Sequence, residues 1–152
     1  MEPADNDVEG KPGTRLITTA VSLGGGDACI AEARHHAAEF LDQARADHGV
    51  AVSERAVDLT RLVVSELVTN ARKHAPGPLR MELSIADDAV EVAVRDSARV
   101  EPAARPADPA RVGRHGLEIV MAVVQAFQVR LEPTGKRVIA RIALTDGPLG
   151  PR

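Results

Sequence analysis

Apolar residues recur along the chain with two different periods, and each period predicts a different kind of element. Residues 28–48 and 54–74 carry apolar side chains every three or four positions, the spacing of one buried helical face. From residue 79 the period falls to two, which is typical of strands with one buried face. In chain order, the expected elements are a strand over 15–23, helices over 28–48 and 54–74, strands over 79–85 and 90–94, a helix over 113–127, and strands over 128–132 and 136–144.

The order of these elements predicts the fold class. It indicates an α/β two-layer sandwich, with a mainly antiparallel mixed sheet and helices on one face. Residues 97–112 contain three prolines and no periodicity, and they predict a loop long enough to act as a lid. The polar, Gly/Pro-bearing ends predict a flexible N-terminal tail over 1–14 and a C-terminal tail over 146–152, which leaves one domain over 15–145.

Capping residues mark the expected helix ends. Asp27 and Ser53 precede the first two helices, and their side chains are suited to accept hydrogen bonds from free backbone N–H groups. Gly49 follows the first helix and favours the left-handed backbone that ends it. Lys73 and His74 close the second helix, where the helix dipole favours positive charge.

Composition limits which kinds of binding partner and which cellular compartment we expect for this protein. The chain has 152 residues with 44% hydrophobic content, which is enough for one domain with its own core. A formal charge of -3 argues against a general electrostatic grip on nucleic acid or on an anionic membrane. The single cysteine, Cys29, excludes an intramolecular disulfide, and no basic start followed by an apolar run is present. We therefore expect a cytoplasmic protein whose partners are proteins or small molecules.

Two polar residues lie on the apolar side of the second helix. Glu66 and Asn70 are one helical turn apart and share a broad face with Val63 and Leu67. Burying a carboxylate without a partner costs several kcal/mol. Two interpretations follow: an ion pair between Glu66 and a basic residue, or a site that opens onto water, a cation or a ligand.

Four segments occur in an order that resembles a known family. They are "SELVTNARKHA", "VAVRDSA", "GRHGLEIV" and "TGKRVIARI". Together they resemble the N, G1 and G2 boxes and the closing strand of the histidine-kinase-like (GHKL) ATPases, and most closely the branch of anti-sigma-factor serine/threonine kinases. The resemblance spans roughly residues 15 to 144. It implies the Bergerat-type ATP-binding fold, with ATP and Mg²⁺ as cofactors.

The resemblance also implies roles for three polar residues. Asn70 matches the family's N-box asparagine, whose carboxamide oxygen binds Mg²⁺. Glu66 matches the glutamate that orients and helps to deprotonate the attacking hydroxyl. Asp96 matches the aspartate that accepts a hydrogen bond from the adenine amino group, although an aspartate followed by serine is also an ordinary turn opener.

The glycines of the family pattern are only partly retained. Gly113 and Gly116 are expected to straddle the start of the third helix, where free N–H groups and the helix dipole favour phosphate. Arg114 is expected to reach phosphate oxygens. Ala98 and Val100 stand where the G1 box has glycines, and the first G2 glycine lies one place early. These departures bear on nucleotide affinity rather than on the fold.

The resemblance implies an ATP-binding regulatory protein similar to an anti-sigma factor with serine/threonine kinase activity. Its expected partners are a sigma factor and an anti-anti-sigma (STAS-type) protein, with no nucleic acid and no membrane, and a homodimer is left open. The alternative is a non-catalytic module of the same fold that sequesters a sigma factor or another regulator. Two further interpretations are less favoured, namely a phospho-acceptor role for His35 or His36 and a zinc site that adds Cys29 and His48.

Overall fold

The computed structural model describes residues 16–24, 26, 28–74, 77–96 and 108–145, and only the backbone of 74 and 108–115. The expected cap Asp27, both expected tails and most of the expected lid therefore lie outside the described residues. In chain order the elements are β1 (Ile17–Leu23), α2 (Ala28–His48), α3 (Glu54–His74), β2 (Leu79–Ala86), β3 (Ala89–Asp96), α4 (Asp108–Val123), β4 (Ala126–Glu132) and β5 (Gly135–Ala143).

The strands form one five-stranded sheet in the order β1-β2-β3-β5-β4. Every pairing among the described strands is antiparallel, so the prediction of a mixed sheet is wrong in that detail. The reason lies in the connections. Two helices separate β1 from β2 and return the chain to the end where β1 stopped, whereas a single crossover helix would give a parallel pair. The α/β sandwich itself is confirmed.

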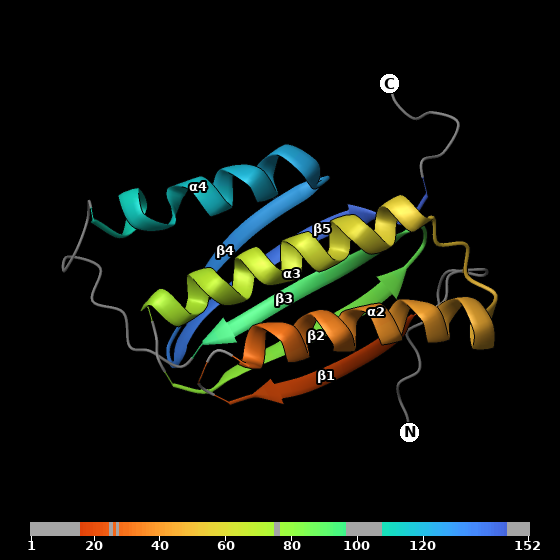
Figure 1. Cartoon of the computed structure of the whole chain (residues 1–152), viewed down its shortest axis with the longest axis horizontal. Helices are drawn as coiled ribbons and strands as arrows, with labels where there is room; N and C mark the ends of the chain where they lie inside the picture. Colours follow the sequence, from red (N-terminus) through yellow and green to blue (C-terminus); the bar gives the residue numbers. More distant parts are fainter. Residues whose placement is uncertain (1–15, 25, 27, 75–76, 97–107, 146–152) are drawn as a thin grey trace.

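The described helices α2, α3 and α4 lie in one layer on the same face of the sheet (Figure 1). The central helix α3 packs on β2, β3 and β5, while α2 covers β1 and β2 and α4 packs against α3. The core between the layers includes the buried face of α2 and, around α3 and the central strands, the apolar side chains of Val63, Val64, Leu67, Val68, Met81, Leu83, Val90, Val92, Val138, Ala140 and Ile142. Each large apolar side chain buried there contributes roughly 1.5–3 kcal/mol.

The expected end of α2 and the start of α3 are confirmed in atomic detail. Gly49 has a φ of 66°, the left-handed backbone at which helices often end, and the N–H of Val50 donates to the carbonyl of Ala44 in the last turns of α2 at 3.1 Å. At the start of α3, the Oγ of Ser53 accepts the N–H of Ala56 at 3.0 Å. These two caps set where α3 begins and hence where its polar residues lie above the sheet.

The third helix begins earlier than the sequence pattern suggested. It starts at Asp108 and ends at Val123, whereas we expected 113–127. The pair Asp108–Pro109 explains the difference, because the fixed φ of proline suits the first turn of a helix as well as a loop. Of the expected lid, residues 108–112 belong to α4, and 97–107 lie outside the described residues. Residues 126 and 127 belong to β4 instead of the helix.

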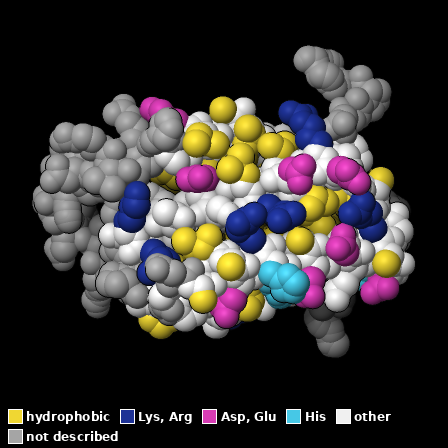
Figure 2. Space-filling model, in the orientation of Figure 1, with side chains coloured by type: hydrophobic (Ala, Val, Ile, Leu, Met, Phe, Trp, Pro, Cys, Tyr) yellow, Lys and Arg dark blue, Asp and Glu magenta, His cyan; other side chains and the backbone are white. Residues whose placement is uncertain are grey.

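The outer face of the helical layer shows acidic and basic side chains interspersed, with apolar side chains gathered over α4 (Figure 2). Met121 on that helix is 57% exposed. Within the described part of the chain, no helix combines the length and the apolar character needed to cross a bilayer.

Candidate functional site

Glu66 lies on the flank of α3 that faces α4. Its side chain is half-buried, and its neighbour Leu67 is fully buried in the core. We had left open an ion pair between Glu66 and a basic residue. Among the described residues, no Lys, Arg or His forms an ion pair with Glu66. The described side chains therefore leave the carboxylate available for chemistry.

Gly116 of α4 packs directly against this carboxylate. A Cβ placed on Gly116 would fall less than 3.0 Å from Oε1 of Glu66 and 3.5 Å from its Cδ. Side chains essentially never approach that closely, so the missing Cβ makes room for the carboxylate. The structure thus brings together two residues that the sequence separates by 50 positions, and both had been predicted to belong to the site.

Asn70 follows Glu66 by one turn along α3. Its side chain is only 7% exposed, and the adjacent Ala71 is buried as well. The two polar residues therefore lie at the edge of the core instead of at the centre of the apolar face. A neutral carboxamide tolerates this burial better than a second carboxylate would, because it carries no charge to desolvate.

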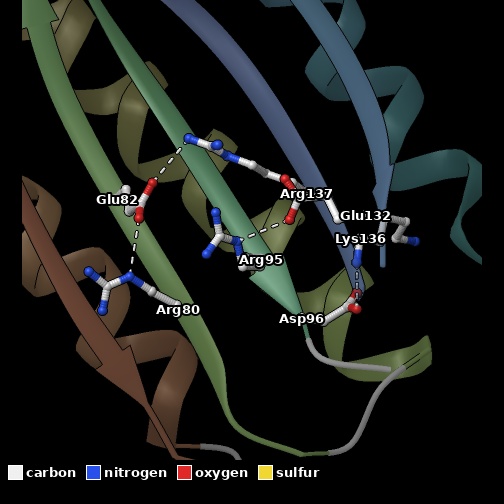
Figure 3. A network of polar contacts seen from close by, with 7 residues as sticks. All are labelled: Arg80, Glu82, Arg95, Asp96, Glu132, Lys136 and Arg137. Carbon is white, nitrogen blue, oxygen red and sulfur yellow. Dashed lines mark hydrogen bonds and ion pairs between the residues drawn. The ribbon is translucent and has the colours of Figure 1, made fainter. Parts of the chain in front are cut away.

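Asp96 is the last residue of β3 and pairs with Lys136 on β5. Its carboxylate is 3% exposed, and its Oδ1 accepts the backbone N–H of Lys136 at 3.2 Å (Figure 3). The bond joins two strand ends and fixes the direction of the carboxylate. Sequence reasoning missed the part played by Lys136, because only the pairing register of β3 and β5 reveals it.

These side chains come from elements that meet at one end of the molecule. The last turns of α3, the end of β3 and the first turns of α4 all lie there (Figure 1). Glu66 and Gly116 are in direct contact, Asn70 lies one turn further toward this end, and Asp96 ends its strand there. The structure therefore groups four of the predicted site residues.

The two glycines do not lie at a helix start, which corrects our expectation. Gly113 and Gly116 lie five and eight positions after the first residue of α4, Asp108. Backbone N–H groups inside a helix are engaged with carbonyls four residues earlier, so these two positions do not supply free phosphate-binding donors. Contact of the nucleotide with Gly113 or with Arg114, whose side chain lies outside the described atoms, stays a prediction.

A hollow of about 400 Å³ lies at the other end of the sheet. Its lining includes His48, Gly49, Asp87 and Asp88, from the end of α2 and the turn between β2 and β3. Because Asp96 pairs with Leu79 at the start of β2, that turn is at the opposite end from Asp96. None of the predicted site residues lines this hollow, so it is not the predicted site.

The fold and the grouped residues define a class of protein: an α/β sandwich consistent with the Bergerat fold, with a carboxylate and a carboxamide on its central helix. The sequence matches the family model of the histidine kinase-like ATPase domain over residues 28–142. This match covers more than half of the chain, and the chain belongs to that family, within the GHKL superfamily. No curated protein is similar enough to serve as a named relative.

Membership of this family implies binding of ATP with magnesium, and the residues present fit that cofactor. The carboxamide oxygen of Asn70 is a hard, neutral ligand of the kind Mg²⁺ accepts. The space left by Gly116 holds the Glu66 carboxylate against α4. Asp96 offers a buried carboxylate whose direction is set by the Lys136 N–H. The individual roles of these residues in nucleotide binding stay predictions.

Proposed function

We propose that the protein is a regulatory serine/threonine kinase that resembles an anti-sigma factor and acts on an anti-anti-sigma (STAS-type) protein. The observation that carries the proposal is the placement of Glu66. It is a half-buried carboxylate with no ion pair to a described residue, held in the space beside Gly116 and one turn from Asn70.

In the proposed mechanism, Asn70 and Asp96 bind and orient, and Glu66 moves a proton. Bound Mg-ATP supplies the transferable phosphoryl group and the metal charge that stabilises it. Asn70 would provide one oxygen to the magnesium ion, and Asp96 would accept a hydrogen bond from the adenine amino group. Glu66 would orient the serine or threonine hydroxyl and accept its proton as the new O–P bond forms, while the bond from the γ-phosphorus to the bridging oxygen breaks and ADP leaves.

The alternative, a non-catalytic binding module, also has an observation in its favour. Gly113 and Gly116 lie inside α4, and Ala98 and Val100 replace the glycines of the G1 pattern, so two expected backbone contacts to phosphate are weakened. Such a module would sequester a sigma factor or another regulator without phosphoryl transfer. Measuring whether the protein transfers phosphate from ATP to a protein substrate therefore distinguishes the two functions.

The test compares Glu66→Gln with a matched control on the same helix, Asp58→Asn. Both substitutions exchange a carboxylate for an amide, but Asp58 is exposed and is not one of the predicted site residues. Each protein is incubated with labelled ATP, magnesium and candidate anti-anti-sigma proteins encoded in the same genome. We expect Glu66→Gln to lower phosphoryl transfer by roughly 10²- to 10⁴-fold with little change in nucleotide affinity, and Asp58→Asn to leave both unchanged.

Three outcomes would contradict the proposal in different ways. Full transfer by a stably folded Glu66→Gln protein would rule out the general-base role. A loss of about 3 kcal/mol of stability, with activity falling only as the fold is lost, would show that Glu66 is half of a buried ion pair. Nucleotide binding by the wild type, seen as a raised melting temperature, without transfer to any candidate would support the binding module.

A further inference from the structure

The face of the sheet opposite the helices carries a row of arginines. Arg80 pairs with Arg95, Arg95 with Arg137, and Arg137 with Arg130, so four neighbouring strands each place an arginine at the same level. We call these four residues the arginine row. Figure 3 shows Arg80, Arg95 and Arg137 in front of their strands with the helices behind, and the register adds Arg130 beside Arg137.

Alternation along the strands explains why all four point away from the helices. The neighbours Met81, Val94 and Val138 are buried in the core, so Arg80, Arg95 and Arg137 face the other side. Arg130 lies directly opposite Arg137 on β4 and therefore shares that side. The side chains of Arg80, Arg95 and Arg137 are 47%, 38% and 26% exposed, and Arg130 is exposed. The row is therefore accessible to another molecule.

Two glutamates neutralise part of this charge. Glu82 accepts from Arg80 and from Arg137, each at 3.1 Å, and Glu132 contacts Arg95 at 3.3 Å (Figure 3). No described acidic residue forms an ion pair with Arg130. Four arginines against two glutamates leave a formal charge of +2 on this patch, within a chain whose formal charge is -3.

Such a row is unfavourable for the sheet alone. The Cβ atoms of residues directly opposite each other on neighbouring strands lie about 5 Å apart, and like charges at such opposite positions destabilise the sheet. Arg130 lies opposite Arg137 and adds to the repulsion between the arginines, and Arg130 itself forms no ion pair with a described carboxylate. A surface with interspersed positive and negative charges keeps a protein soluble without this repulsion. A row of positive charges alone therefore indicates a negatively charged binding partner.

We infer that the arginine row docks an acidic amphipathic helix of a partner protein, laid across the strands. Neighbouring strands place the arginines about 4.8 Å apart, close to the roughly 5–6 Å between helix positions i and i+3 or i+4. Each guanidinium has five N–H donors, more than its contacts with Glu82 or Glu132 occupy, which suits bidentate contact with a carboxylate. The surface does not depend on nucleotide binding, since it lies on the other side of the sheet.

The next level of the same face supplies an apolar contact. There Glu82 pairs with Ala93, and Ala93 pairs with Ile139. Ala93 is buried, so the accessible apolar surface at this level comes from the half-buried Ile139. A helix with an acidic stripe beside an apolar stripe would therefore match both levels at once. A second copy of this chain matches less well, because a two-fold contact through this face would bring the two arginine rows toward each other.

The probe is a labelled synthetic helix with glutamates at i, i+4 and i+7 and leucines on the adjacent stripe, titrated into the full chain by fluorescence anisotropy. Arg130→Glu is the test variant, since it removes no ion pair to a described residue and should not unfold the protein. Arg34→Glu is the matched control, because Arg34 is exposed on α2 and likewise has no ion pair to a described residue.

We expect Arg130→Glu to weaken peptide binding by roughly tenfold, Arg34→Glu by less than twofold, and raised salt to abolish most of the affinity. A peptide with glutamine in place of glutamate should not bind. Equal weakening by both variants would overturn the inference, as would tighter binding of a short DNA duplex than of the peptide. A stable dimer that dissociates only on Arg130→Glu would show that a second copy covers this face, which also overturns it.

Discussion

Replacing Gly116 with alanine should leave the stability of the fold almost unchanged while it lowers the rate of phosphoryl transfer at the proposed site. A Cβ at this position falls within 3.0 Å of Oε1 of Glu66, whereas ordinary contact begins at 3.4 Å, so the oxygen must move by more than 0.4 Å. That oxygen is the far end of a flexible side chain, which can move at small cost. The backbone of α4 can therefore stay in place while the carboxylate is displaced.

Two opposing effects set the change in the free energy of unfolding. Alanine is favoured over glycine inside a helix by roughly 0.5–1 kcal/mol. Forcing Glu66 away from a preferred rotamer costs about 0.5–1.5 kcal/mol. We expect these effects to cancel to within about 1 kcal/mol, which shifts the melting temperature by a few degrees at most. Phosphoryl transfer should fall by about 10²-fold, because catalytic groups tolerate displacements of only about 0.5 Å.

The assay uses four proteins: the wild type, Gly116→Ala, Glu66→Ala and the double variant. Thermal unfolding and transfer of labelled phosphate are measured on the same preparations. In the Glu66→Ala background the new Cβ meets no carboxylate, so Gly116→Ala should stabilise the fold by the full helix preference of roughly 0.5–1 kcal/mol. Additive effects of the two substitutions on stability would refute the contact, and full transfer by Gly116→Ala would refute its role in positioning Glu66.

Two other predictions concern the ends of elements. Asp96→Asn should weaken ATP binding by roughly tenfold, measured by calorimetry, because an amide N–H₂ group, which only donates, replaces the carboxylate oxygen that would accept from the adenine amino group. The melting temperature should change little, since the amide oxygen can still accept the Lys136 N–H; unchanged affinity would argue against the adenine-binding role. Ser53→Ala should cost about 1 kcal/mol in denaturant unfolding, because Ser53 Oγ caps α3 through the N–H of Ala56. A loss below a few tenths of a kcal/mol would mean that this cap is dispensable.

Much of the fold follows from local sequence. The periods of three to four and of two residues predicted α2, α3, β2 and β3 almost to the residue, because each period reflects which face of an element is buried. Caps are local too, and Ser53 and Gly49 were correctly assigned from their own chemistry. The spacing of Glu66 and Asn70 also sufficed to place them one turn apart on α3.

The start of α4 was mispredicted because one local signal has two meanings. Proline breaks a helix in its interior but is favoured in its first turn, so Pro109 was taken as part of the lid. The consequence reaches the site, since Gly113 and Gly116 move from a helix start to a helix interior. The role of Gly116 then changes from offering a free N–H to making room for a carboxylate.

Only the tertiary structure decided which distant residues meet. The contact of Glu66 with Gly116 depends on how α3 packs against α4, and the bond from Lys136 to Asp96 depends on the register of β3 with β5. The arginine row has no signature in the sequence, because its members lie at irregular positions on four strands. Periodicity and capping are properties of contiguous residues, whereas register and helix packing are set by burial of the whole core, so the site and the arginine row appear only once the layers have assembled.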